Sequence, residues 1–176
     1  MIKFLNLLRK PKLQETYQIN SFLTEEKCKK ILDKLNQINF DKARQFDQGR
    51  HNKELFTDDA SITDLIKIEI EKLRINKREI KGYSFPFEFY RYDKEDFIDP
   101  HTDSSITLSN GNVSNYTALI YLNDDYFGGE TYFIEKNIKV KPKQGTLLLF
   151  QHHLVHEAQK IVFGTKYIYR SNWHIG

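Results

Sequence analysis

The segment GTLLLFQHHLVHEAQKIVFGTKYIYRSNW, residues 145–173, decides the fold, because short apolar runs alternate in it with turn-forming residues. The runs occupy residues 146–151, 154–162 and 166–173, and Gly164 separates the last two. Short runs that are rich in β-branched and aromatic residues are typical of β-strands. The segment therefore predicts three consecutive short strands.

The same pattern continues upstream as far as residue 83. Further apolar runs lie at residues 85–92, 116–122, 130–134 and 138–140. Turn-forming pairs separate many of these runs, among them Asp99-Pro100 and Gly128-Gly129. Many short strands with frequent turns predict a sandwich or a barrel.

The first 82 residues follow a helical pattern. Thr24 can cap a helix over residues 24–38, whose apolar residues form one stripe: Cys28, Ile31, Leu32, Leu35 and Ile38. A second helix is predicted over residues 61–74. Residues 41–60 are polar and irregular, and loops of this length are often functional, so we predict a mobile lid there, with an inert surface excursion as the alternative.

These patterns together predict one domain over residues 1–176, mainly β with supporting α structure. Residues 83–176 are expected to form the core, a jelly roll or double-stranded β-helix. Residues 1–82 are expected to supply helical support and a loop, with the helices packed on one sheet.

The composition narrows the class of protein. The formal net charge is +3, and Lys and Arg are interleaved with Asp and Glu, so no nucleic-acid partner is expected. The single cysteine, Cys28, rules out an internal disulfide and fits a reducing compartment.

Residues 1–10 lack the apolar run of a secretory signal, and no stretch approaches the roughly 20 apolar residues of a membrane span. We therefore expect a cytoplasmic protein without a membrane partner. The oligomeric state does not follow from the sequence.

His101 and Asp103 form a candidate pair of metal ligands in the sequence Pro100-His101-Thr102-Asp103. Alternate side chains of an extended segment share a face, so the imidazole and the carboxylate can converge on one ion. By itself the pair is weak evidence, because a surface turn after Pro100 would look the same. Two histidines and one carboxylate, with open positions opposite, are typical of non-haem Fe(II) oxygenases.

The third ligand is expected among three histidines that lie close together. His152 and His153 are adjacent, so they face opposite sides of a strand, and they fall where one strand must turn into the next. His156 falls inside the following run, and we prefer it as the ligand. His152 and His153 are then expected to be solvated turn residues. A zinc site is the alternative for such a cluster, which the lone cysteine makes weak.

Lys166 is a candidate for binding an anion. A buried cation that faces a pocket is costly unless it meets an anion, and a dicarboxylate bound to iron would supply one. A surface lysine on a strand is the other reading. Because Gly164 turns the chain, we expect Lys166 on the strand antiparallel to that of His156, with both side chains facing the interior.

Residues 83–174 resemble the prolyl 4-hydroxylase-like branch of the 2-oxoglutarate and Fe(II)-dependent dioxygenases. The matching segments, in order, are Tyr90-Arg91-Tyr92, Pro100-His101-Thr102-Asp103, Tyr121-Leu122-Asn123-Asp124, Gly128-Gly129-Glu130-Thr131-Tyr132-Phe133, Lys141-Pro142-Lys143-Gln144-Gly145, Leu149-Phe150, His156-Glu157 and Gly164-Thr165-Lys166-Tyr167. Their order and spacing resemble the family throughout. Together they are far more specific than any single motif.

The resemblance implies a role for each matching residue. His101, Asp103 and His156 match the iron ligands, and Lys166 matches the lysine that pairs with the distal carboxylate of 2-oxoglutarate. Tyr92, Tyr121 and Thr131 match positions around the same co-substrate, although Tyr121 and Thr131 could equally be plain strand residues. No side-chain general base is implied, so no catalytic residue is expected beyond the metal ligands.

Two further residues are candidates for contact with the substrate. Arg50 lies in the segment Arg50-His51-Asn52-Lys53-Glu54, which resembles a loop that precedes the barrel in some members. Trp173 begins the sequence Trp173-His174-Ile175. The family often has Trp-Ile-His near this point, but its Trp stands one residue closer to the lysine than Trp173 does. A slip of one residue reverses the face of a strand, so Trp173 could instead cover the core.

The resemblance implies an oxygenase with Fe(II) as its cofactor, 2-oxoglutarate and O2 as co-substrates, and ascorbate as a further candidate. The leading substrate is a prolyl residue in a peptide or protein, and a free amino acid or another small molecule is the alternative. A nucleic-acid demethylase would need more arginines after His156 than Arg170 alone. A non-catalytic jelly-roll binding module is the reading from another class, and the complete triad with Lys166 argues against it.

Overall fold

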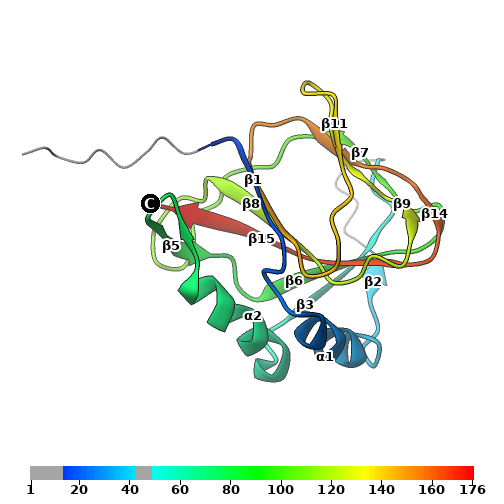
Figure 1. Cartoon of the computed structure of the whole chain (residues 1–176), viewed down its shortest axis with the longest axis horizontal. Helices are drawn as coiled ribbons and strands as arrows, with labels where there is room; N and C mark the ends of the chain where they lie inside the picture. Colours follow the sequence, from blue (N-terminus) through cyan, green and yellow to red (C-terminus); the bar gives the residue numbers. More distant parts are fainter. Residues whose placement is uncertain (1–13, 43–48) are drawn as a thin grey trace, which may run out of the picture.

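The computed structural model describes residues 14–42 and 49–176. Two β-sheets face one another, and the helices α1 (Glu25–Leu35) and α2 (Ala60–Lys72) cover the outer face of the larger sheet (Figure 1). This is the predicted jelly roll with helices packed on one sheet. Neither of these helices is long and apolar enough to cross a membrane.

The larger sheet holds nine strands of the described residues. Seven follow one another in the order β1 (Thr16–Ile19), β12 (Leu147–Gln151), β8 (Tyr116–Tyr121), β15 (Lys166–Ile175), β6 (Phe87–Tyr92), β3 (Lys53–Thr57) and β2 (Asp41–Lys42). Beside them, β5 (Arg78–Tyr83) pairs with the end of β15, and β4 (Arg74–Ile75) pairs with β5. All of these pairs are antiparallel.

The smaller sheet has the order β11 (Ile138–Val140), β10 (Thr131–Phe133), β13 (His156–Ala158) and β7 (Ile98–His101). A separate pair is formed by β14 (Ile161–Phe163) and β9 (Phe127–Gly128). The candidate ligand His101 therefore ends β7, and His156 begins its antiparallel neighbour β13.

Two apolar cores result from the alternation of side chains along the strands of the larger sheet. On β12, Leu147 and Leu149 pack toward the helices, whereas Leu148 and Phe150 pack into the space between the sheets. All four are buried. Since burying one such side chain contributes roughly 1.5–3 kcal/mol, both faces of this sheet are strongly specified. The site lies on the inner face.

The first helix forms where the sequence predicts it but is shorter, since α1 ends at Leu35 and Ile38 lies beyond it, 36% exposed. The Thr24 hydroxyl accepts a hydrogen bond from the Lys27 N–H, which caps the helix. Cys28, Ile31 and Leu35 are buried against the sheet. Burial raises the pKa of the Cys28 thiol to about 12, with a smaller contribution from Glu25, so this thiol is an inert core residue.

The first 82 residues contribute more than helical support and a loop. The strands β1, β3 and β5 come from this part of the chain and extend the larger sheet. The predicted lid is wrong for residues 53–57, because β3 pairs with β6 over its whole length. Residues 43–48, which the lid prediction also included, lie outside the described residues.

The predicted strand over residues 154–162 is in fact two strands. Its first part is β13 in the smaller sheet, and its second part is β14, which pairs with β9. The chain changes partner at Gln159 and Lys160, where the Gln159 N–H donates to the Glu130 carbonyl. The apolar pattern does not reveal such a change of sheet, because the spacing of apolar residues along a strand does not depend on which strand it pairs with.

Candidate metal and co-substrate site

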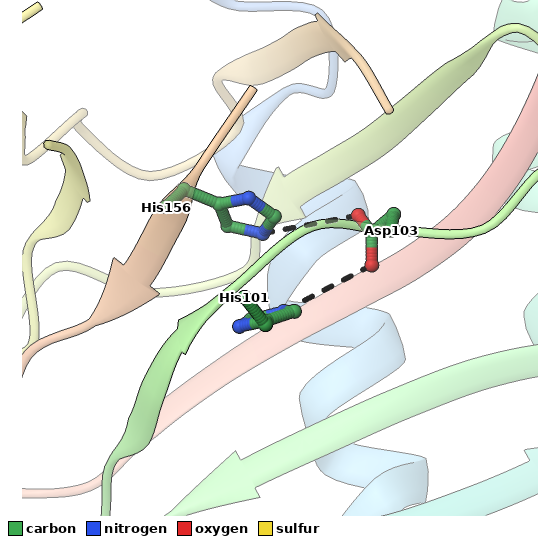
Figure 2. A group of neighbouring side chains, drawn as sticks. All are labelled: His101, Asp103 and His156. Atoms are coloured by element: carbon green, nitrogen blue, oxygen red, sulfur yellow. Dashed lines mark ion pairs between the residues drawn. The ribbon is translucent and has the colours of Figure 1, made fainter. Parts of the chain in front are cut away.

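Three predicted ligands converge between the sheets. His101 and His156 are directly opposite one another in the β7–β13 pair, and their ring centroids are 4.3 Å apart. Asp103 follows two residues after His101. Its carboxylate lies 3.9 Å from Nε2 of His101 and 3.8 Å from Nε2 of His156. Dashed lines mark both pairs in Figure 2. One ligand atom from each residue lies within 4.8 Å of the others.

Backbone carbonyls set the orientation of both histidine rings. Nδ1 of His101 lies 2.8 Å from the Asp99 carbonyl oxygen, and Nδ1 of His156 lies 2.9 Å from that of Leu154. A carbonyl oxygen only accepts, so each Nδ1 carries a proton and Nε2 is the nitrogen that faces Asp103. Metal-binding histidines are oriented in this way in many proteins. The donor set therefore fits a divalent transition metal.

The protonation states also fit metal binding. Burial lowers the pKa of His156 to about 4, against the opposing effect of Asp103, so the imidazole is neutral. Burial would raise the pKa of Asp103, but the Arg170 cation, together with the hydrogen bond from the Thr117 hydroxyl, holds it well below its ordinary value. A neutral imidazole and an ionised carboxylate are the forms that bind a metal.

The Asp103 carboxylate is held at both oxygens. The Arg170 guanidinium donates to Oδ1 at 3.0 Å, and the Thr117 hydroxyl donates to Oδ2 at 2.5 Å. The other Arg170 nitrogen, Nη1, lies 3.5 Å from a carboxylate oxygen of Glu88. Sequence reasoning did not assign these partners. The signal was present, because Arg170 stands four residues from Lys166 and therefore on the same face of its strand.

The ligands open into a cavity of about 570 Å³. Its lining includes the three ligands together with Tyr92, Thr131, Lys166 and Arg50. All of these were predicted from the sequence as site residues. Cavities of this size hold small ligands or part of a larger one. The structure therefore brings one set of metal ligands and one set of anion-binding candidates to a common space.

Lys166 lies in the wall of this cavity, and its amino group is buried. Its side chain is 1% exposed, and its ammonium donates to the Gly129 carbonyl at 2.6 Å. The same nitrogen lies 5.0 Å from the ring centroid of Tyr92 and 5.3 Å from that of Tyr121. Burial lowers the pKa of Lys166 to about 7, and the Glu130 carboxylate opposes this shift. An anion here would meet a donor with few competing partners.

The hydroxyl candidates lie around the ammonium. Tyr121 and Thr131 share a hydrogen bond of 2.6 Å between their hydroxyl oxygens. Thr131 and Tyr92 line the cavity, whereas Tyr121 is fully buried behind Thr131. Tyr126, which the sequence did not single out, also has its ring 6.0 Å from the Lys166 nitrogen. The candidates therefore form one aromatic and hydroxyl-bearing wall around the lysine.

The expected pairing of the Lys166 and His156 strands is wrong. β15 lies in the larger sheet and β13 in the smaller one, because β14 carries the chain from one to the other. Lys166 instead pairs with Tyr92 of β6. Lys166 and His156 nevertheless line the same cavity, so the expectation that both face the interior is confirmed.

The two substrate candidates have different positions. Arg50 lines the cavity, and its guanidinium carbon lies 4.6 Å from the ring centroid of Tyr90. Trp173 is fully buried in the core beneath the helices and does not line the cavity. A substrate contact for Trp173 is therefore wrong, and its alternative role in the core is correct. Asn172, its neighbour on the opposite face of β15, lines the cavity instead.

His152 and His153 do lie in the predicted turn, and neither belongs to the metal-binding group. His153 is exposed and lies 3.4 Å from a carboxylate oxygen of Glu15. His152 is buried, so the expectation of a solvated residue is wrong for it. It follows Leu148 and Phe150 at two-residue spacing, which directs its ring inward, and its carbonyl accepts a hydrogen bond from the Asp103 N–H.

Residues 87–174 match a family model described as the 2OG-Fe(II) oxygenase superfamily. The chain is similar to prolyl 4-hydroxylase 1 of Arabidopsis thaliana, with 38% identity over segments that cover 34% of this chain and 27% of the relative. A putative prolyl 4-hydroxylase of Acanthamoeba polyphaga mimivirus is 35% identical over 37% of this chain and 27% of the relative. The similarity thus spans about a quarter of the length of these curated relatives.

Solved structures resemble the whole fold. The viral collagen prolyl hydroxylase of Paramecium bursaria Chlorella virus-1 is 18% identical, with a TM-score of 0.70 over 91% of this chain and 96% of that one. A prolyl hydroxylase of Trichoplax adhaerens, solved with a peptide fragment of hypoxia inducible factor, is 19% identical, with a TM-score of 0.71 over 90% and 83%. A prolyl-4-hydroxylase of Pseudomonas putida is 15% identical, with a TM-score of 0.65 over 91% and 92%. At these identities the likeness establishes the jelly-roll fold.

Proposed function

Because the chain belongs to the 2OG-Fe(II) oxygenase superfamily, we propose that it is a dioxygenase that hydroxylates a C–H bond of a prolyl residue in a peptide or protein. The observation that carries this proposal is the convergence of His101, Asp103, His156 and Lys166 on one cavity. A non-catalytic binding module would not need two oriented imidazoles, an ionised carboxylate and a buried ammonium in the same space.

Each group has a defined task in this proposal. His101, Asp103 and His156 hold Fe(II), and Lys166 pairs with the distal carboxylate of 2-oxoglutarate, near the hydroxyl of Thr131. When bound, iron and 2-oxoglutarate supply the oxidising chemistry, with O2 as the second co-substrate. The residues of this chain orient the reactants and keep water away from them. Ascorbate is a candidate addition to the assay.

The choice of a prolyl substrate rests on the similar proteins. The relatives and structures named above carry prolyl hydroxylase names, and the Trichoplax adhaerens structure holds a peptide. The cavity of about 570 Å³ is large enough for a small ring, and its lining includes Tyr90 and Ile168 beside the metal ligands. A cytoplasmic location is also part of the proposal, and cell fractionation with an antibody to the chain tests it.

Mass spectrometry of products tests the function. The protein is incubated with Fe(II), 2-oxoglutarate and O2, together with a panel of proline-containing peptides and, separately, free L-proline. We expect a peptide to gain the mass of one oxygen atom on a prolyl residue, with an equal amount of succinate. Omission of Fe(II), or the variant Asp103→Ala, should abolish both products.

The outcomes separate the two parts of the proposal. Hydroxylation of free L-proline, with no peptide modified, would show that the substrate class is wrong while the reaction is right. An unmodified panel with no iron-dependent succinate would show that the chain is not such an enzyme. Full turnover by Asp103→Ala would show that the metal site has been misassigned.

A further inference from the structure

Asn172 lines the cavity with a buried side-chain amide that is not fully hydrogen-bonded. The residue is 5% exposed and lines the cavity, yet its amide oxygen has no hydrogen-bond partner among the described residues. Buried polar atoms are almost always partnered, because an unmade hydrogen bond leaves the cost of desolvation uncompensated. An unpartnered amide in a cavity wall therefore indicates a group that completes its bonding when a ligand is bound.

The backbone of Asn172 is firmly held. Its N–H donates to the Ser84 hydroxyl at 3.1 Å, and its carbonyl accepts from the Ser84 N–H at 2.9 Å. Asn172 is also paired with Thr117 across β15 and β8. Since both backbone groups have partners, the missing bond belongs to the side chain alone. Rotation about the last side-chain torsion, which is broad for Asn, can turn its oxygen toward a ligand.

The strand shows where Asn172 stands relative to Lys166 and Arg170. Lys166, Ile168, Arg170 and Asn172 stand at two-residue spacing on β15, and all four line the cavity. Four residues of strand span about 13 Å and six span about 20 Å. Arg170, which bonds to the metal ligand Asp103, therefore lies between Lys166 and Asn172. Asn172 therefore stands on the side of Arg170 away from the co-substrate lysine, so a ligand group at Asn172 does not compete with 2-oxoglutarate for Lys166.

The position relative to the metal ligands supports the same conclusion. Thr117, the cross-strand partner of Asn172, donates its hydroxyl to Asp103. The Asn172 side chain therefore stands beside Thr117, whose hydroxyl is hydrogen-bonded to the carboxylate of a metal ligand. A substrate group that reaches Asn172 is therefore close to the metal ligands.

We propose that Asn172 is a specificity-determining residue whose amide oxygen accepts a hydrogen bond from a substrate N–H beside the oxidised carbon. This inference rests on the proposed function and defines its substrate class more narrowly. A prolyl residue in a peptide has no N–H of its own, so the donor is the amide of the residue that follows it. In free proline the donor would be the ring nitrogen. Both sources share the same chemistry, and the experiment separates them.

Isosteric removal of the donor tests the proposal. Two peptides are compared that differ only in the bond after the target proline, which is an amide in one and an ester in the other. Free L-proline is compared with its oxygen analogue, tetrahydrofuran-2-carboxylate. We expect wild type to prefer the N–H substrate of the correct source by about tenfold in kcat/KM, the size expected for one buried hydrogen bond.

Two variants identify the acceptor. In Asn172→Ala the amide and ester substrates should react equally, at the rate that wild type shows with the ester. Asn172→Asp keeps an oxygen acceptor and should retain the preference for the N–H substrate. The KM for 2-oxoglutarate should match wild type in both variants, because Asn172 is remote from Lys166 along the strand, and thermal unfolding of each variant is measured alongside it to show that the protein remains folded.

The contrary results are distinct from a failure of the proposed function. Equal reaction of amide and ester with wild type, or a preference that survives in Asn172→Ala, would overturn this inference while hydroxylation stands. Absence of hydroxylation for every peptide and for proline would overturn the proposed function, and this inference with it.

Discussion

Arg170 and Asp103 form a buried ion pair, with Nη2 of the guanidinium 3.0 Å from Oδ1 of the carboxylate. The side chains are 16% and 11% exposed, and Glu88, on the other side of Arg170, is 12% exposed. One cation thus lies between two carboxylates. Removal of one member of such a group leaves uncompensated charge in the interior.

The variant Arg170→Met should therefore be destabilised before any metal is added. We expect a loss of about 3–5 kcal/mol in the free energy of unfolding, measured by urea titration of the metal-free protein. Added Fe(II) or Co(II) should recover part of the loss, because it supplies positive charge to Asp103. An unfolding free energy equal to that of wild type would show that the pair contributes nothing to stability.

Lys166 should determine the affinity for 2-oxoglutarate. A charge-assisted bond to a carboxylate contributes roughly 1.5–3 kcal/mol, so Lys166→Ala should raise the apparent constant for 2-oxoglutarate at least about tenfold. Lys166→Arg should restore it only in part, because the planar guanidinium needs a different pocket depth. Titration of succinate release gives these constants, and Co(II) binding should be unchanged in both variants.

An unchanged constant in Lys166→Ala would mean that another cation holds the co-substrate. Arg170 is the alternative on the same strand face. Its two amino nitrogens, however, already contact Asp103 and Glu88. The structure therefore makes Lys166 the more available of the two.

The affinity for 2-oxoglutarate should weaken as the pH rises above about 7. Burial lowers the pKa of Lys166 to about 7, and a bound dianion favours the protonated amine. Below that pH the amine is already protonated, so binding takes up no proton. Above it, binding must restore the proton, and affinity should fall by up to about tenfold per pH unit. Calorimetric titration of the metal-loaded protein measures this dependence.

Lys166→Arg is the matched control for the pH effect. The arginine stays charged throughout this range, so its affinity for 2-oxoglutarate should change little with pH. A wild-type affinity that is equally flat would show that the amine is charged before the co-substrate arrives, in spite of its burial.

Trp173 and Asn172 are neighbours on β15 that face opposite sides of the sheet. Trp173 packs in the core, whereas Asn172 lines the cavity. Trp173→Ala removes a fully buried ring from the core and should cost about 3–5 kcal/mol of unfolding free energy. The milder Trp173→Phe should leave the substrate KM within about twofold of wild type. Urea unfolding and product assays measure the two effects. A large rise in substrate KM for Trp173→Phe, with unchanged stability, would restore a substrate role for Trp173.

The sequence predicts the inner strands well, because their apolar residues repeat with the period of a buried strand. β8, β12 and β15 all lie within one residue of the predicted runs at their start. β3 and β5 were not predicted, because Lys53–Thr57 and Arg78–Tyr83 carry charged residues that are typical of loops. Their pairing with β6 and β15, rather than local preference, makes them strands.

The site was predictable where it depends on local order along the chain. His101 and Asp103 are two residues apart, and the resemblance supplied His156 and Lys166. Arg170 and Thr117 were not assigned as partners of Asp103, because that contact joins a loop to the opposite sheet. His152 was expected in solvent, since a turn position alone does not reveal that its ring points inward.

The most direct measurement is a crystal structure of the protein grown without oxygen in the presence of Fe(II) and 2-oxoglutarate. Our prediction is one metal bound by His101, Asp103 and His156, with metal–nitrogen distances of about 2.0–2.3 Å. The same prediction places the distal carboxylate of 2-oxoglutarate against the Lys166 ammonium. A metal bound by His152 or His153, or a co-substrate carboxylate held by Arg170 with Lys166 still bonded only to the Gly129 carbonyl, would contradict it.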